Sequence, residues 1–261
     1  MNTTHKLKIA LIQTDLLWEK PKENRSHIEA QINKLSSDID LIILPEMFTT
    51  GFTMNAKKVA EKIDGDTVTW MQKLVQEKDC AITGSIIIKE NESFFNRLLF
   101  VHPSGKFDFY DKKHTFTLAG EHEVFSSGNN KILIDYKGWK ICPLICYDLR
   151  FPVWARNTNN YDLLLYVASW PKKRIEAWDT LLKARAIENM SYTIGVNRIG
   201  VDANNFEYNG NSVAYDMLGN CLAKNDKSEA VSLIIEIDKN KQDSVRNKFR
   251  FLEDRDDFRF Q

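Results

Sequence analysis

The stretch Ile141-Cys142-Pro143-Leu144-Ile145-Cys146-Tyr147-Asp148-Leu149-Arg150-Phe151-Pro152 places a short apolar run directly before a cysteine. The run Lys140–Ile145 predicts a buried strand, and the residues after Cys146 predict the start of a helix. A thiol on such a strand-to-helix turn lies near backbone N–H groups that can hold an oxyanion, so Cys146 is a candidate nucleophile. Taken alone, the segment also fits a buried core cysteine, and we keep that interpretation for Cys142.

Other short runs rich in Ile, Val and Leu alternate with helical patterns along the chain. The continuously apolar runs are typical of sheets that are covered on both faces, and the repeated strand–helix order favours a layered α/β fold. The predicted strands are Lys8–Gln13, Leu41–Pro45, Ala81–Ile88, Asn96–His102, Leu163–Ala168, Tyr192–Asn197 and Val231–Ile237, and the helical patterns cover Ile28 to Leu35, Val68 to Val75, Val153 to Arg156 and Trp178 to Ile187. We expect one domain over about residues 5–236.

The C-terminal residues 237–261 differ from the rest because they are charged, with four phenylalanines interleaved: Phe249, Phe251, Phe258 and Phe260. One interpretation is a solvated extension with a few anchoring aromatic side chains. The other is an arm that packs on a second subunit.

The composition limits the classes of partner that the protein is expected to bind. Lysine plus arginine and aspartate plus glutamate each number 36, so the formal net charge is zero. A neutral balance gives no field toward nucleic acid or anionic lipid, and we expect neither as a partner. No apolar run approaches the ~20 residues that span a bilayer. The four cysteines form no CxxC pair and no disulfide scaffold, which predicts free thiols and a cytoplasmic location.

Two further segments carry charged residues at places where chemistry is common. Glu46 follows an apolar run that ends at Pro45, so a strand would hold it rigidly beside apolar neighbours that raise its pKa toward that of a general base. Lys112 lies in the charged segment Tyr110–Phe116 and could bind a developing oxyanion. Each segment alone also fits an ordinary surface charge.

Metal and nucleotide sites have little support. His114 and His122 lie eight positions apart (122 − 114 = 8), a spacing that matches no usual zinc pattern, so we expect no metal. The chain has neither GxGxxG nor a Walker loop. A nucleophile–base pair of Cys146 and His114 is conceivable, but it leaves Glu46 and Lys112 without a role.

The three segments together resemble a known family. Pro45-Glu46, Lys112-x-His114 and Cys146-Tyr147-Asp148-x-Arg150-Phe151-Pro152, in this order and with Ala119-Gly120-Glu121 between, resemble the Glu–Lys–Cys motifs of the nitrilase superfamily of carbon–nitrogen hydrolases. The resemblance covers roughly residues 7–236. Residues 170–174, 178–189 and 195–200 resemble the omega-amidase branch, which hydrolyses the terminal amide of 2-oxoglutaramate and 2-oxosuccinamate.

The resemblance implies a four-layer αββα sandwich, usually paired into a homodimer, that acts on a small-molecule amide without metal or organic cofactor. It assigns Cys146 as nucleophile, Glu46 as general base and Lys112, two residues before His114, as the lysine. It also implies a supporting role for Glu121. Thr115 stands where leucine is commoner in the family, and we expect no catalytic consequence.

Substrate contacts are predicted less sharply. A substrate of the omega-amidase branch carries a carboxylate, and Arg174 or Lys173, just after Trp170-Pro171, could hold it. Phe48 and Trp170 could wall the pocket, and the backbone N–H of Tyr147 could join Lys112 at the oxyanion. The alternatives are solvated loop charges and ordinary core aromatics.

Three rival functions remain open at this point. The first is another carbon–nitrogen hydrolase of the same fold, such as a carbamoylase, an aliphatic amidase or a nitrilase. The second is a non-catalytic, partner-binding protein that kept the fold. The third is a redox sensor that pairs Cys142 with Cys146, but four residues of strand span roughly 13 Å, beyond the reach of a disulfide.

Overall fold

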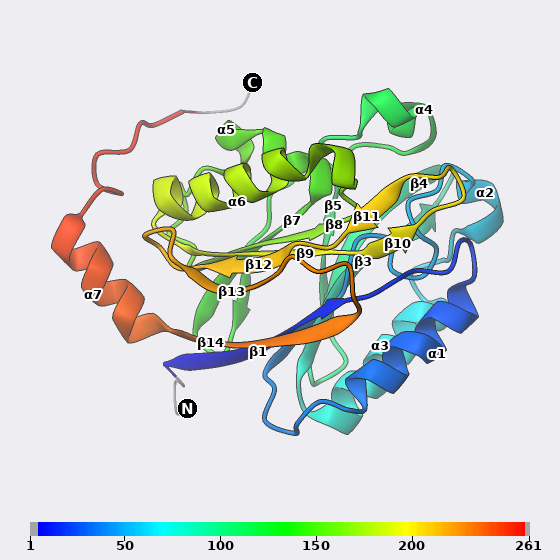
Figure 1. Ribbon diagram of the computed structural model, residues 1–261, viewed down its shortest axis with the longest axis horizontal. Helices are drawn as coiled ribbons and strands as arrows, with labels where there is room; N and C mark the ends of the chain where they lie inside the picture. The colour runs from blue at the N-terminus through cyan, green and yellow to red at the C-terminus, as the bar shows by residue number, and fades with distance from the viewer. Residues whose placement is uncertain (1–4, 259–261) are drawn as a thin grey trace.

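Two six-stranded sheets face each other at the centre of the computed structural model, which describes residues 5–258 (Figure 1). The first sheet has the order β14 (Val231–Asp238), β1 (Lys6–Gln13), β2 (Leu41–Ile43), β3 (Ala81–Glu90), β4 (Ser93–Val101) and β5 (Phe107–Asp111). The second has the order β13 (Cys221–Asn225), β12 (Ser212–Tyr215), β9 (Tyr192–Asn197), β8 (Leu163–Ala168), β7 (Trp139–Ile145) and β6 (Ile134–Tyr136). A separate pair joins β10 (Ile199–Val201) and β11 (Glu207–Asn209).

Strand β1 illustrates the layering, because successive side chains of a strand point to opposite faces. Leu7, Ile9 and Leu11 belong to the apolar cluster that includes residues of both sheets. Ala10 and Ile12 belong to a second cluster, shared with helices α1 (Pro21–Ile32) and α3 (Asp66–Lys78). The first sheet is therefore buried on both faces, by the second sheet on one side and by helices on the other.

Helices α5 (Pro152–Ala155) and α6 (Ile175–Asn189) cover the outer face of the second sheet (Figure 1). Helix α6 lies so close to β9 that a Cβ atom at Gly195 would be 2.4 Å from Leu182 Cδ1 and 2.6 Å from Trp178 Cζ2. A larger residue at Gly195 would push the helix away. The order helix, sheet, sheet, helix confirms the predicted αββα sandwich.

Strands β8 and β9 occupy the residues that their continuous apolar runs predicted. The predicted strand at Leu41–Pro45 ends earlier, at Ile43, because Pro45 cannot donate to the ladder. The sequence analysis missed β5, β6 and the strands from β10 to β13. These are short or carry exposed polar residues, and β13 is almost wholly exposed.

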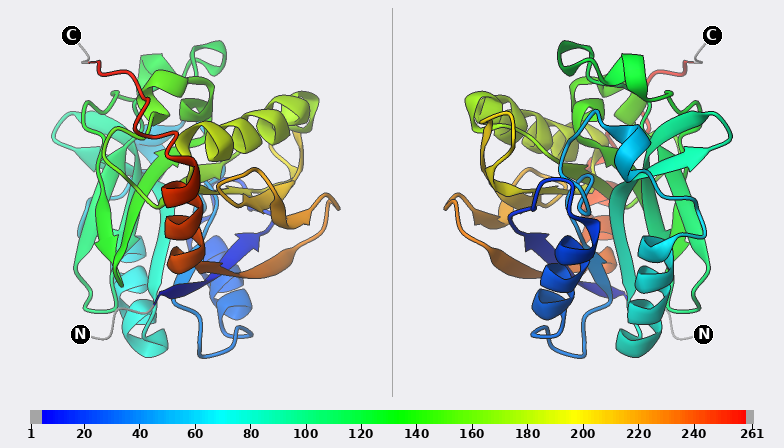
Figure 2. Two further views of the ribbon diagram at one scale, coloured as in Figure 1. Left: turned by 90° about the vertical axis from the view of Figure 1, so that its left-hand side faces the viewer. Right: turned by 90° about the vertical axis from the view of Figure 1, so that its right-hand side faces the viewer.

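The C-terminal tail begins with a helix that the sequence analysis did not predict, α7 (Lys239–Phe249). Asp238 caps its first turn, and the buried Gln242 donates from Nε2 to the carbonyl of Asp162 at 2.7 Å. Arg246 also bonds Asp162, at 3.1 Å. This helix lies against its own chain (red in Figure 2), although most of its residues are exposed. Phe260 lies outside the described residues.

The short connecting helices lie near the strand ends that carry the candidate residues. They are α2 (Ala56–Val59), η1 (Thr117–Ala119), α4 (Glu121–Val124), η2 (Cys146–Arg150) and η3 (Lys172–Arg174). Strands β7, β8 and β9 are parallel, so their carboxyl ends meet at one edge of the sheet. Ligand sites in α/β sheets lie beyond such ends. No helix among residues 5–258 is long and apolar enough to cross a membrane.

Candidate active site

Cys146 begins η2 directly after β7, on a tight and strained turn. Its backbone φ is +43°, a value that is unfavourable for a residue with a side chain and that is common at functional turns. Asp148 stabilises the turn because its Oδ2 accepts the Ile145 N–H at 3.0 Å. Cys146 is 9% exposed and lines a cavity. The strand and the turn together present the sulfur to that cavity, as the sequence predicted.

Glu46 lies just beyond β2 and is completely buried. Its Oε2 accepts the backbone N–H of Ser169, which follows β8, at 2.8 Å. Its Oε1 accepts a hydrogen bond from Lys112 Nζ at 2.9 Å. Ser169, which belongs to the second sheet's side of the site, therefore fixes a carboxylate that follows a strand of the first sheet, and each carboxylate oxygen of Glu46 has a hydrogen-bond donor.

Lys112, which follows β5, has its ammonium group between two carboxylates. Its Nζ lies 2.9 Å from Glu46 Oε1, and 3.0 and 2.9 Å from the two oxygens of Glu121. Burial by itself lowers the pKa of Lys112, but the charges of Glu121 and Glu46 outweigh it and raise the pKa above its ordinary value. Lys112 therefore remains a fixed cation next to Cys146.

The pKa of Cys146 lies well above its ordinary value, first because the thiol is buried and then because Glu46 is negatively charged. Lys112 acts in the opposite direction but does not prevail. The resting group is thus a thiol that hydrogen-bonds Glu46. A thiol in this state needs a base before it can attack a carbonyl, and Glu46 is the carboxylate in contact with it.

Asn96 in β4 completes this charged cluster, and the sequence analysis missed it. Its Nδ2 donates to Glu46 Oε1 at 2.8 Å and to Glu121 Oε1 at 3.3 Å. Its backbone oxygen accepts the Lys112 N–H at 3.0 Å. The available signal was a single amide beside Arg97 in a mostly apolar run, but the pairing of β4 with β5, which brings Asn96 next to Lys112, was not predicted.

His114 faces Asp148 rather than the nucleophile. Asp148 Oδ1 accepts from the backbone N–H of His114 at 3.0 Å and lies 2.8 Å from its ring Nδ1. The ring stacks on Phe151 with centroids 3.6 Å apart. This contact joins the Lys112 turn to the Cys146 turn and gives no support to a Cys–His catalytic pair. Within the described part of the chain, no group of three or more His, Cys, Asp or Glu side chains could hold a metal ion.

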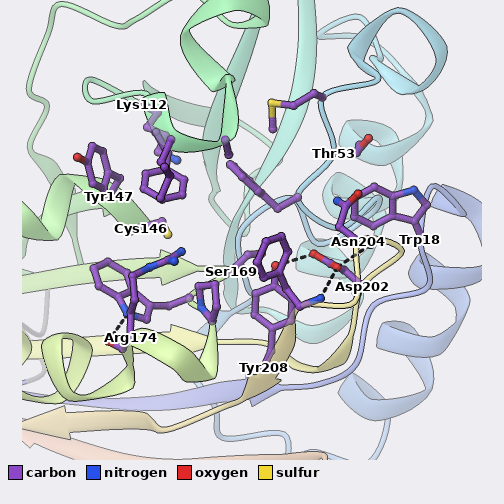
Figure 3. Close-up of a pocket in the computed structure, with 18 of the residues that line it drawn as sticks. Trp18, Thr53, Lys112, Cys146, Tyr147, Ser169, Arg174, Asp202, Asn204 and Tyr208 are labelled. Carbon is purple, nitrogen blue, oxygen red and sulfur yellow. Dashed lines mark hydrogen bonds between the residues drawn. The ribbon is translucent and has the colours of Figure 1, made fainter.

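A cavity of about 570 Å³ opens beside the sulfur. Figure 3 shows Lys112, Cys146, Tyr147 and Arg174 toward one end, and Trp18, Thr53, Asp202 and Asn204 toward the other. Trp170 also lines it. The structure therefore brings together Lys112, Cys146, Tyr147, Trp170 and Arg174 from the predicted set, with Glu46 and Glu121 buried behind them.

Two expected contacts are not formed. Phe48 is fully buried in the helix-covered core, where its ring lies 6.0 Å from that of Trp70, so it does not wall the cavity. Phe52, four residues further along, lines the cavity instead and lies 5.2 Å from Lys112 Nζ. Lys173 is exposed and is not part of the lining.

Arg150 is a cavity residue that the sequence analysis did not single out. Its guanidinium lies 5.1 Å from the ring of Trp170, and the guanidinium of Arg174 lies 5.1 Å from the ring of Phe116. The indole N–H of Trp170 donates to the carbonyl of Arg174 at 2.8 Å. The signal available in sequence was only the position of Arg150, four residues after Cys146.

Known proteins are similar to this chain in sequence and in fold. The family model described as carbon-nitrogen hydrolase matches residues 8–247. The omega-amidase YafV of Escherichia coli (strain K12) is 42% identical over 253 residues, 97% of this chain and 98% of that protein. A 2-oxoglutaramate amidase of Bacillus subtilis (strain 168) is 32% identical over 254 residues, 95% and 97% of the two chains.

A solved structure agrees with these sequence matches. XC1258 from Xanthomonas campestris, described as a CN-hydrolase superfamily protein with an arsenic adduct in its active site, superposes with a TM-score of 0.96 at 38% identity. The match covers 99% of this chain and 100% of that one. The resemblance of the three motifs is thus confirmed, and the chain belongs to the carbon–nitrogen hydrolase family.

Proposed function

We propose that this protein is an omega-amidase, which hydrolyses the terminal amide of 2-oxoglutaramate or 2-oxosuccinamate to the 2-oxo dicarboxylic acid and ammonia. Near full-length similarity to an omega-amidase and to a 2-oxoglutaramate amidase supports the activity. The observation that carries the chemistry is the buried contact of Lys112 with Glu46, next to the Cys146 thiol at the cavity.

In the first half of the reaction, Glu46 takes the proton of the Cys146 thiol while the sulfur attacks the amide carbonyl. The tetrahedral oxyanion is held by the ammonium of Lys112 and by the backbone N–H of Tyr147. Glu46 then returns the proton to the nitrogen, the carbon–nitrogen bond breaks, and ammonia leaves. The acyl group remains on Cys146 as a thioester.

In the second half, Glu46 takes a proton from a water molecule whose oxygen attacks the thioester. Collapse of the second tetrahedral intermediate breaks the carbon–sulfur bond and restores the Cys146 thiol with the proton held by Glu46. The same carboxylate acts as base, acid and base again, which fits its contact with both the sulfur and Lys112. Glu121 supports the cycle by keeping Lys112 charged and in place.

The principal alternative is a different small substrate for the same chemistry, such as an N-carbamoyl amino acid, an aliphatic amide or a nitrile. A panel that compares ammonia release from 2-oxoglutaramate with release from these compounds separates the possibilities. Preference for 2-oxoglutaramate supports the proposal, and preference for any other class contradicts it. A protein that turns over no member of the panel and alkylates Cys146 no faster than its other thiols would fit the non-catalytic alternative.

The assembly and the location follow as secondary proposals. Helices α5 and α6 carry the exposed apolar side chains Val153 and Ile187, and Phe251 in the tail is 55% exposed. These positions support a homodimer in which α5, α6 and the tail meet a second copy. Sedimentation should give a dimer that Val153→Glu dissociates, and a monomeric wild type would contradict the assembly. The four free cysteines support a cytoplasmic location.

A further inference from the structure

The charged side chains that face the cavity differ in how many hydrogen-bond and ion-pair partners they already have within the protein. Lys112 is offset by Glu46 and Glu121, which both contact its ammonium. Asp202, at the far end, already accepts the Tyr208 hydroxyl at 2.8 Å and two backbone N–H groups of its own loop. Lys112 therefore serves the oxyanion at the reacting carbon, and Asp202 has the wrong sign for an anion, so neither group is available to the carboxylate of the substrate.

Arg150 and Arg174 differ from these groups. Among residues 5–258, neither guanidinium has an ion pair or a side-chain hydrogen bond, whereas the buried Arg97 and Arg198 are each paired with an aspartate. Each of the two lies over an aromatic ring, which orients a guanidinium without using its N–H donors. Two oriented guanidinium groups with free donors that line the same cavity as Cys146 are suited to a planar anion.

Trp170 connects the two arginines. Its ring lies under the Arg150 guanidinium, and its indole N–H holds the backbone carbonyl of Arg174. Trp170 is only 3% exposed, so the exposed Arg150 and the partly buried Arg174 both contact a buried residue of the cavity wall. The aromatic rings beside both guanidinium groups and their shared contact with Trp170 make this end of the cavity a pre-formed anion-binding site.

We propose that Arg150 and Arg174 bind the carboxylate and the 2-oxo oxygen of the substrate, and that their charges reject omega-amides with a 2-ammonium group. This inference rests on the proposed function and deepens it. A 2-oxo oxygen accepts a hydrogen bond from a guanidinium, whereas an ammonium at the same carbon would face two cations without a partner. The cavity therefore selects oxo-acid amides over amino-acid amides such as glutamine.

Four amides test the selection: 2-oxoglutaramate, glutaramate without the 2-substituent, glutamine with a 2-ammonium group, and butyramide without a carboxylate. For the wild type, kcat/KM from ammonia release should be highest for 2-oxoglutaramate. It should be at least about 100-fold higher for glutaramate than for glutamine, because like charges brought together cost several kcal/mol. Equal hydrolysis of glutaramate and glutamine would overturn the inference.

The variants Arg174→Gln and Arg150→Gln should each raise KM for 2-oxoglutaramate about 10- to 100-fold, the range of a charge-assisted hydrogen bond. Both should leave kcat/KM for butyramide unchanged, and the double variant should lose the preference for glutaramate over glutamine. Lys172→Gln is the matched control, because Lys172 is exposed, pairs with Glu207 and does not line the cavity. Equal losses on butyramide and 2-oxoglutaramate would refute the assignment.

A binding measurement separates this inference from the proposed function. Calorimetry of glutarate with the Cys146→Ala protein reports the anion site without turnover. Weaker binding when Arg174→Gln or Arg150→Gln is added supports the site even if the wild type releases no ammonia from 2-oxoglutaramate, a result that would sink the omega-amidase proposal alone. Unchanged glutarate binding overturns the inference even if 2-oxoglutaramate is hydrolysed.

Discussion

Asn96 donates one amide group to two buried carboxylates: its Nδ2 lies 2.8 Å from Glu46 Oε1 and 3.3 Å from Glu121 Oε1. These two acids share the single ammonium of Lys112, so the cluster carries more negative than positive charge. The amide therefore helps to hold Glu46 and Glu121 in fixed positions around the Lys112 ammonium.

Replacing Asn96 by leucine should lower kcat about 10-fold, because Glu46 and Glu121 lose the amide donor that holds both carboxylates in place beside Lys112. Asn96→Asp should lower kcat further, because it places a third carboxylate in the cluster. Steady-state kinetics of ammonia release measures both changes.

Thr83→Val provides the matched control for the change at Asn96. Thr83 is buried on the neighbouring strand β3, and its Oγ1 has no hydrogen-bond partner among the described residues. Thr83→Val should keep the kcat of the wild type. An unchanged kcat in both Asn96 variants would show that the amide does not position Glu46 for catalysis.

Cys146→Ala should abolish amide hydrolysis and leave the free energy of unfolding close to that of the wild type, because only one small side chain next to the cavity is truncated. Mass spectrometry of wild-type protein quenched during turnover should find the acyl group on Cys146. Cys221→Ser, at an exposed thiol, is the control and should keep full activity. Turnover by Cys146→Ala, or an adduct on Cys142, would rule out the assigned nucleophile.

The resemblance of the three motifs to the carbon–nitrogen hydrolases predicted that Glu46, Lys112 and Cys146 lie together, and the structure brings the three side chains into contact. Their catalytic roles stay predictions. Phe48 and Phe52 show the limit of that reasoning. The chain turns between them, with Gly51 at φ +71°, so the ring of Phe48 enters the core and that of Phe52, for which the sequence analysis made no prediction, enters the cavity.

Asn96 and Arg150 were missed for a related reason. The role of Asn96 depends on the register between β4 and β5, in which Arg97 pairs with Asp111, and β5 alternates polar and apolar residues too briefly to be predicted. The role of Arg150 depends on the path of η2 toward Trp170. Neither a strand register nor the path of a short turn follows from local sequence preferences.

His114→Ala should lower kcat about 10-fold with little change in KM, because the imidazole braces the Lys112 turn against Asp148 without entering the cavity. His114→Asn keeps a donor close to the ring Nδ1 and should restore part of the rate. His102→Ala is the control, because His102 pairs with Asp108 at the protein surface. A higher KM together with a lower kcat, with no rescue by asparagine, would indicate a merely structural role.

Lys112→Met should reduce kcat at least about 100- to 1,000-fold, the usual loss when one oxyanion donor is removed. It should also destabilise the fold, because Glu46 and Glu121 would be left buried without their cation. Adding Glu121→Gln to Lys112→Met removes one of these charges and should restore much of the stability in urea titrations, while the activity stays lost.

Lys113→Ala is the matched control, because Lys113 lies next in the chain, contacts Asn129 and does not line the cavity. If Lys113→Ala and Lys112→Met lost equal activity, or if the double variant regained turnover with its stability, Lys112 could not be the group that holds the oxyanion.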